Sequence, residues 1–176
     1  MSIEKTISNE NKSVLGYFIL CITQKYFCFK GRARRKEYWS FILFNFLISF
    51  ALAFIIGFIG TSASNVSGIN ILISIIKLAL LIPGYAVLFR RLHDVNFSGW
   101  WAILPILGIL ISGIMSGYIS VSQQIGTGTA GIEIIPIIAT VIGFISIIAG
   151  LLVFILTFRK SSMKENKYGP VPEGVK

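Results

Sequence analysis

Residues 134–158 read IIPIIATVIGFISIIAGLLVFILTF, a run without a single charged side chain. A helix that crosses the hydrocarbon core of a bilayer needs about 20 mainly apolar residues, and this run exceeds that length. Three similar runs precede it, at residues 39–60, 69–89 and 100–119. The sequence therefore predicts an all-α polytopic membrane protein with four transmembrane helices.

The composition of the whole chain agrees with this interpretation. Of its 176 residues 55% are hydrophobic and only 13% are charged, and its mean hydropathy is +0.81. Soluble domains carry about a quarter of charged residues, and they need a largely polar exterior that this chain cannot provide. Composition thus excludes a soluble globular domain, and the net charge of +9 is better explained by membrane topology than by nucleic-acid binding, for which no motif is present.

The basic residues predict the orientation of the helices. Eight Lys or Arg precede the first apolar run, two lie in the 90–99 connector and five follow residue 158, whereas the connectors 61–68 and 120–133 have none. Because Lys and Arg accumulate in loops that stay in the cytoplasm, we expect both termini there and those two connectors in the periplasm. The expected division is a cytoplasmic segment 1–38, a transmembrane domain 39–158 and a cytoplasmic tail 159–176.

A shorter apolar pattern lies ahead of the first transmembrane run. Val14, Leu15, Phe18, Ile19 and Ile22 recur at helical spacing after Ser13, a good N-cap residue. The segment is too short to span a bilayer, so we expect an amphipathic helix on the membrane surface. The alternative is a helix packed against the other helices.

Three motifs together carry a family resemblance. They are Gly31–Trp39 (GRARRKEYW), Arg90–Trp101 (RRLHDVNFSGWW) and Asn166–Pro170 (NKYGP). The set resembles the domain of unknown function 805 family (DUF805), the YhaH-like bacterial inner membrane proteins, over nearly the whole chain. The resemblance implies a small inner membrane protein with several spanning helices and implies no mechanism.

The first two motifs contain most of the candidate contact residues. Glu37 and Asp94 are the only acids amid two basic clusters, so we expect Arg–carboxylate pairs between the segment before the first long helix and the 90–99 connector. The remaining basic groups suit anionic lipid or a protein partner, and the paired tryptophans suit the headgroup layer. The candidate lipid or partner contacts are Arg32, Arg34, Arg35, Glu37, Arg90, Arg91, His93, Asp94, Trp100 and Trp101.

Signs of catalysis are weak. The sequence has no metalloprotease, nucleophile-elbow, P-loop or dinucleotide motif, and the apolar runs contain no carboxylate. His93 beside Asp94 could serve as a general base or a pH sensor, but a structural hydrogen bond that holds the loop is the favoured interpretation. We therefore predict no enzyme activity, no catalytic residues, no cofactor and no metal.

Lys77 is the one charge inside an apolar run. A charge near the centre of a transmembrane helix costs about 2.5–3.5 kcal/mol on insertion scales, so Lys77 should face polar groups in the bundle or a wet cavity. The alternative is a shifted or tilted helix from which Lys77 reaches the head groups. Lys77 and Pro83 also support a second function hypothesis, a small transporter or channel subunit with Lys77 on a polar path.

Small residues predict where helices touch. Transmembrane helices approach closely where Gly, Ala or Ser recur about every four residues. The residues that fit this pattern are Ala53, Gly57, Gly113, Gly117, Ala139, Gly143, Ser146 and Gly150, with Ser112 and Ser116 beside the central pair. The pattern supports a bundle and leaves open whether the chain also forms homo-oligomers.

Overall fold

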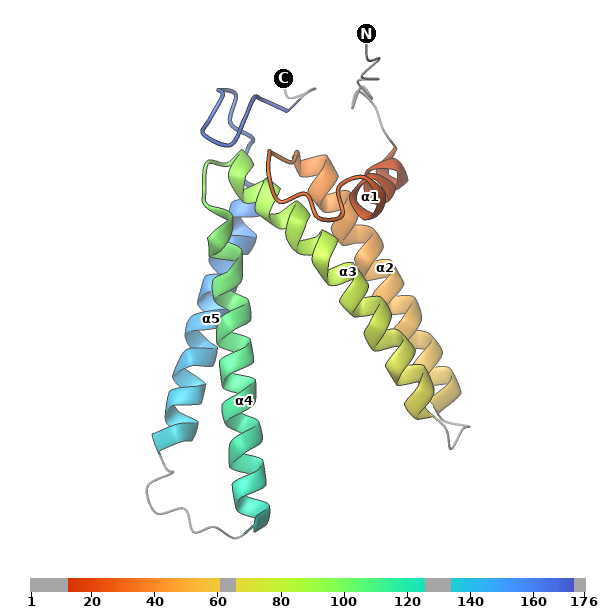
Figure 1. The fold of residues 1–176 in the computed structure, drawn as a ribbon, viewed down its shortest axis with the longest axis vertical. Coiled ribbons are helices and arrows are strands. Elements are labelled where there is room, and N and C mark those ends of the chain that lie inside the picture. Colours follow the sequence, from red (N-terminus) through yellow and green to blue (C-terminus); the bar gives the residue numbers. More distant parts are fainter. Residues whose placement is uncertain (1–12, 61–65, 126–133, 173–176) are drawn as a thin grey trace. The chain divides into compact units, whose positions relative to one another are not determined.

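The computed structural model describes residues 13–60, 66–125 and 134–172. Five α-helices and one 3-10 turn follow one another in that part of the chain (Figure 1), and none of its residues belongs to a β-sheet. They are α1 Val14–Thr23, α2 Arg35–Gly60, α3 Val66–Asp94, η1 Gly99–Ala102, α4 Ile103–Ile125 and α5 Ile134–Phe158. In this described part, four helices are long and apolar enough to cross a membrane, which confirms the predicted fold class.

The helix bounds correct two sequence-based expectations. Helix α2 begins at Arg35 and not at Trp39, and α3 continues to Asp94 and not only to Phe89. The segment from Arg90 to Asp94, expected as a loop, is therefore the last helical turn of α3. The predicted bounds of α5 are confirmed at both ends. The connectors predicted to face the periplasm lie largely outside the described residues.

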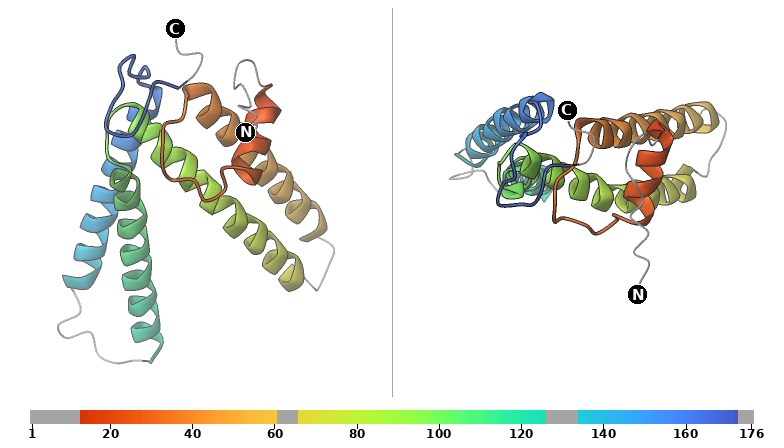
Figure 2. Two further views of the ribbon diagram at one scale, coloured as in Figure 1. Left: turned by 45° about the horizontal axis from the view of Figure 1, so that its top comes forward. Right: turned by 90° about the horizontal axis from the view of Figure 1, so that it is seen from above.

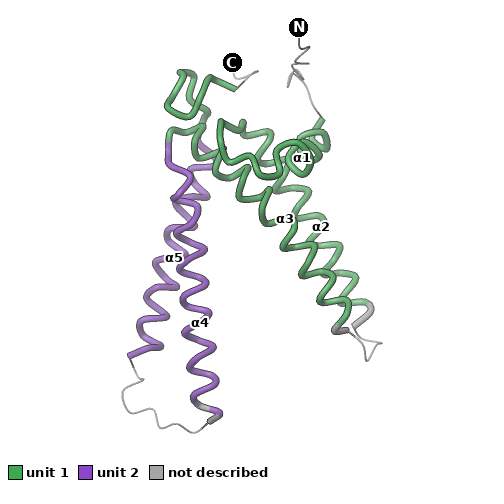
Figure 3. The backbone as a smooth tube through the Cα atoms, viewed as in Figure 1, with its two compact units in different colours: residues 1–96, 160–176 green, residues 97–159 purple. Residues whose placement is uncertain are grey.

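The chain divides into two compact units, coloured green and purple in Figure 3. Unit 1 contains residues 1–96 and 160–176, and unit 2 contains residues 97–159. In unit 1 the long helices α2 and α3 run side by side, as the views of Figures 1 and 2 agree, and α1 lies against them. In unit 2 the helices α4 and α5 pair in the same way.

Helix α1 packs by one face and exposes the other. Ser13 caps it by accepting a hydrogen bond from the backbone N–H of Gly16 at 3.1 Å. Phe18 lies in the core of unit 1, with its ring centroid 5.6 Å from that of Phe41 on α2. The outward face carries the exposed apolar side chains of Val14, Leu15 and Ile19. The expected short N-terminal helix is therefore present, and a bilayer surface would suit its outward face.

Helix α3 passes through Pro83 without ending. A proline has no N–H, so the carbonyl four residues earlier loses its helical donor. That carbonyl belongs to Ala79, and the hydroxyl of Tyr26 donates to it at 2.6 Å. In lipid an unpaired carbonyl would be costly, so the segment after α1 supplies the hydrogen bond that the proline removes.

The α4–α5 pair confirms one part of the small-residue prediction and corrects another. The face of α5 with Gly143, Ser146 and Gly150 does lie against α4. This face of α5 comes closest to α4 at Gly108. A Cβ added to Gly108 would lie 1.5 Å from the Ser146 Oγ. Added Cβ atoms at Gly57, Gly113 and Gly117 would meet nothing within 4 Å. Within their own units these three glycines therefore mark no close helix contact.

Candidate functional site

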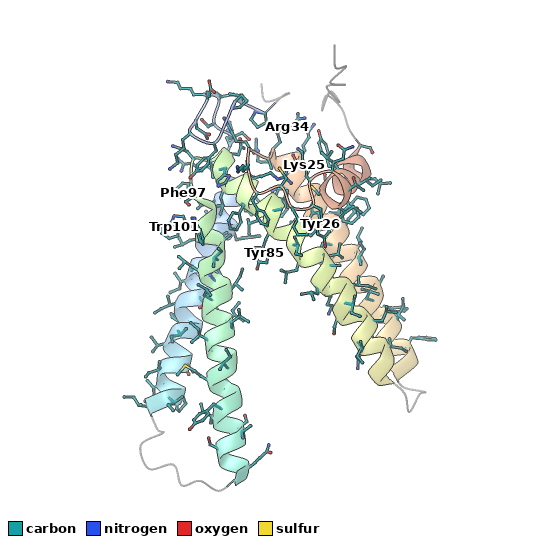
Figure 4. All side chains as sticks on the ribbon, viewed as in Figure 1. Lys25, Tyr26, Arg34, Tyr85, Phe97 and Trp101 are labelled. Atoms are coloured by element: carbon teal, nitrogen blue, oxygen red, sulfur yellow. The ribbon has the colours of Figure 1, made fainter. Side chains whose placement is uncertain are left out.

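A cluster of charged side chains is buried in unit 1, where α1, the start of α2, the end of α3 and the C-terminal tail come together (Figure 4). Lys25 and Arg34 are labelled in that view, at the end of α2 and α3 that carries α1. We call this the ion-pair cluster; its members are Lys25, Arg32, Glu37, Arg90, Arg91 and Asp94.

Asp94 is the centre of the first half of the cluster. The Arg32 Nε donates to its Oδ1 at 3.0 Å, the Arg32 Nη2 lies 2.9 Å from the same oxygen, and the Arg91 Nη1 donates to its Oδ2. The Asp94 and Arg91 side chains are 0% exposed and that of Arg32 is 1% exposed. Buried charges are tolerated only when paired and hydrogen-bonded, and here both carboxylate oxygens have guanidinium donors.

Glu37 is the centre of the second half. It lies in the first turn of α2, where the helix dipole favours a carboxylate. The Arg90 Nη1 donates to its Oε1, and the Lys25 Nζ lies 3.4 Å from the same oxygen. The structure thus confirms the predicted Arg–carboxylate pairs, since Arg32 reaches Asp94 and Arg90 reaches Glu37 across about 50 to 60 residues of chain.

Cys21 completes this half of the cluster. Its thiol lies 3.8 Å from the Glu37 Oε1, and the Arg90 Nη2 lies 3.9 Å from its sulfur. Burial, reinforced by the negative charge of Glu37, raises the pKa of the Cys21 thiol to about 11. The side chain therefore stays a neutral thiol at physiological pH and acts as a weak hydrogen-bonding group, because only the thiolate is a strong nucleophile.

The C-terminal tail is held on the end of α3 by Arg32. Its guanidinium donates to the carbonyls of Ser162 at 2.6 Å, Lys164 at 3.0 Å and Gly169 at 3.4 Å. The last four carbonyls of any helix lack helical donors, and the tail supplies one here, since the Ser162 N–H donates to the Asp94 carbonyl at 3.3 Å. One arginine thus joins a carboxylate at the end of α3 to the tail.

The third motif also binds α3 directly. The side-chain amide of Asn166 donates to the His93 carbonyl at 2.9 Å, and its Oδ1 accepts from the Tyr168 N–H at 3.0 Å. The Tyr168 ring stacks on the His93 imidazole, with centroids 3.9 Å apart and planes at 9°. Gly169 has φ +135°, which an L side chain rarely adopts. The Asn-x-x-Gly spacing is the sequence signal for this turn, although no role was predicted for Asn166 or Tyr168.

His93 and Asp94 have separate partners. The His93 Nδ1 lies 3.2 Å from the Gly31 carbonyl, and no hydrogen bond joins His93 to Asp94 among the described residues. Asp94 is instead occupied by two arginines. The favoured structural interpretation of His93 therefore agrees with its contacts. Within the described ranges, no group of three or more His, Cys, Asp or Glu side chains is arranged to hold a metal ion.

The other predicted contact residues lie outside the ion-pair cluster. The Arg34 Nη2 donates to the Tyr17 hydroxyl at 3.1 Å, which ties α1 to the segment before α2, whereas Arg35 is exposed. Trp100 and Trp101 are exposed on η1 in unit 2. Because Arg32, Arg90 and Arg91 are buried in internal ion pairs, they are not open to a lipid head group.

Lys77 lies away from this cluster. It is exposed on α3 and lines a groove between α2 and α3 with a volume of about 340 Å³. The expectation that it lines a cavity agrees with this position. A role for Lys77 in transport stays a prediction.

Comparisons with known proteins point to one family. The family described as "Protein of unknown function (DUF805)" matches residues 26–170. Inner membrane protein YhaH of Escherichia coli strain K12 is 43% identical over 95 residues, which are 52% of this chain and 77% of that protein. Inner membrane protein YhaI of the same strain is 37% identical over 95 residues, 52% of this chain and 75% of that protein. No solved structure matches the chain.

Proposed function

This chain belongs to the DUF805 family, and we propose that it is a non-enzymatic inner membrane protein whose cytoplasmic basic face binds anionic lipid head groups. The observation that carries the proposal is the division of the basic residues of unit 1 into two sets. One set is buried in the ion-pair cluster. The other is exposed at the same end of unit 1 and consists of Lys30, Arg35, Lys36, Lys160, Lys164 and Lys167.

We call the exposed set the basic face. Few acidic side chains are exposed to balance its positive charge. Glu165 is the only exposed acidic side chain among the described residues of unit 1. Arg32 holds the tail in place, so the three tail lysines are presented without a large ordering cost on binding. Anionic lipids attract such clusters of basic side chains at the membrane surface.

Lack of catalysis is the second element of the proposal. Asp94 is paired with Arg32 and Arg91, and the raised pKa of Cys21 keeps its thiol neutral. His93 therefore has neither a carboxylate nor a thiolate partner in the cluster. General acid–base and nucleophilic catalysis both need such pairs. The ion-pair cluster acts instead as the rigid support of the basic face.

The orientation of the chain is a further element, and thiol labelling can test it. Single cysteines placed at Ser64 or Gly128, in a variant without Cys21 and Cys28, should react with an impermeant thiol reagent added to cells with a permeable outer membrane. A cysteine at Lys164 should react only after the inner membrane is broken. The expectation follows from the absence of Lys and Arg in the two connectors. Labelling of position 164 in intact cells would reverse the proposed topology.

Lipid binding can be measured on the purified full chain in detergent. Native mass spectrometry should show more bound phosphatidylglycerol than phosphatidylcholine, and salt should reduce the difference. Changing Lys160, Lys164 and Lys167 to glutamine should weaken phosphatidylglycerol binding by about tenfold or more, because each basic residue contributes to the attraction.

A matched control keeps the interpretation specific. Lys77→Gln removes one positive charge away from the basic face and should leave the phosphatidylglycerol preference unchanged. An equal uptake of both lipids by the wild type, or an unchanged preference in the three-lysine variant, would contradict lipid binding by this face. Either result would be expected if the basic face binds an acidic segment of a partner protein instead of lipid.

A further inference from the structure

The groove beside Lys77 is lined by polar side chains, including the tyrosines Tyr38 and Tyr85, and by an apolar wall. It lies wholly in unit 1 and is lined from α2 by Ile42, Asn45 and Ser49 and from α3 by Lys77, Leu81 and Leu88, among others. On α2, Asn45 and Ser49 are four residues apart and so share one face. The lining residues span eleven positions on each helix, from Tyr38 to Ser49 on α2 and from Lys77 to Leu88 on α3. Eleven positions correspond to roughly 16 Å of helix. The groove is therefore elongated.

Three polar side chains of this groove have no partner among the described residues. Neither Lys77 nor Asn45 nor Ser49 forms a hydrogen bond or ion pair with any residue in the described part of the chain. Elsewhere in the long helices serines bond to their own backbone, as Ser74 does to the Asn70 carbonyl at 2.8 Å and Ser116 to the Ser112 carbonyl at 2.7 Å. An ammonium, an amide and a hydroxyl thus line the same groove with their donors unused.

Lys77 also lies well inside the long apolar helix α3. It lies eleven residues from the start of α3 at Val66, or roughly 16 Å along the helix, which is about half of the 30 Å hydrocarbon thickness. A lysine side chain is shorter than this distance. The described acids of unit 1 are Glu37 in the first turn of α2, Asp94 at the end of α3 and Glu165 in the tail, and none of them pairs with Lys77.

These observations define the chemistry of a ligand. An anion would pair with the ammonium of Lys77 and accept hydrogen bonds from Asn45 and Ser49, and charge-assisted hydrogen bonds of this kind are strong outside water. An extended apolar chain would cover Leu81 and Leu88 along the rest of the groove. Binding sites for small molecules have this character, with apolar walls, a few convergent polar groups and volumes from about 300 Å³ upward.

We propose that the α2–α3 groove binds a single-chain anionic amphiphile, with its carboxylate at Lys77 and its acyl chain along the groove. One narrow groove of about 340 Å³ suits one chain better than the two chains of a phospholipid. The site is separate from the basic face, because none of the residues of that face lines the groove. The proposal is therefore independent of the lipid binding proposed above.

The test uses the purified full chain in a non-ionic detergent and the fluorescent fatty acid cis-parinarate. The wild type should bind it saturably, and oleate should displace it. Oleyl alcohol, which has the same chain without the charge, and phosphatidylglycerol, which has two chains, should displace it at least about tenfold less well. Equal displacement by either competitor would overturn the carboxylate or the single-chain assignment.

Variants locate the site. Lys77→Leu should weaken binding by about tenfold or more, Lys77→Arg should retain it, and Lys36→Leu, a lysine of the basic face, should have no effect. Leu81→Trp keeps the charge of Lys77 but fills the groove with a larger side chain, so it should abolish binding. Full binding by Lys77→Leu or by Leu81→Trp would overturn the site, and Leu81→Trp alone decides if Lys77→Leu does not fold. Absence of saturable binding by the folded wild type would overturn the proposal altogether.

Discussion

Replacing Asp94 with alanine is expected to destabilise unit 1 by about 3–5 kcal/mol, because it leaves two buried guanidinium groups without a counter-charge. Arg32 and Arg91 are 1% and 0% exposed, and Asp94 is the carboxylate that pairs with both. The loss should appear as a lower melting temperature of the purified full chain in detergent. The tail should also become more sensitive to protease, since Arg32 holds both Asp94 and the tail carbonyls.

Glu165→Ala is the matched control for this change. It also removes one carboxylate close to the basic residues of unit 1, but Glu165 is exposed and forms no ion pair with another described residue. Its melting temperature should therefore stay close to that of the wild type. A melting temperature of Asp94→Ala equal to that of Glu165→Ala would mean that the ion-pair cluster does not stabilise the fold.

Adding one methyl group at Gly108 is expected to disrupt the α4–α5 contact. The new Cβ would lie 1.5 Å from the Ser146 Oγ and 2.8 Å from its Cβ. Rotating the Ser146 hydroxyl away would break its hydrogen bond to the Ile142 carbonyl, now 2.7 Å long, and would not relieve the second clash. Gly108→Ala should therefore cost about 1–3 kcal/mol, the usual range for overpacking, as measured by thermal unfolding of the full chain.

Two further variants separate overpacking from other effects. Gly113 lies on the same helix but has open space around an added Cβ, so Gly113→Ala should be neutral or slightly stabilising, because alanine favours helix over glycine. Combining Gly108→Ala with Ser146→Gly removes the clashing side chain and should restore most of the lost stability. A double variant no more stable than Gly108→Ala would show that the two residues do not contact each other.

The hydrophobic runs predicted the spans well, because the length and polarity of a transmembrane helix are properties of consecutive residues. The helix ends were predicted less well. The turn from Arg90 to Asp94 was expected as a loop because it is charged, and charge is usual in solvated connectors. In the structure this turn is helical, since Arg90, Arg91 and Asp94 find partners from the segment before α2, from the first turn of α2 and from the tail.

The candidate residues show the same contrast. The sequence alone indicated that Glu37 and Asp94 would pair with arginines, because they are the only acids amid the two basic clusters. It could not indicate which arginines would be buried, since several offered the same chemistry and the answer depends on where α1 and the tail pack. Arg32 and Arg90 became buried partners, whereas Arg35, three residues from Arg32, is exposed.

Local properties of the chain, hydropathy and charge, were thus sufficient to derive the membrane class and the number of long helices. Contacts between distant segments were not derivable from them. Asn166 on His93, Tyr26 on Ala79 and Lys77 beside Asn45 and Ser49 all join residues at least 28 positions apart. Each contact depends on how the helices and the tail are packed in three dimensions. Nothing in the local sequence around these residues shows which neighbours packing will bring to them.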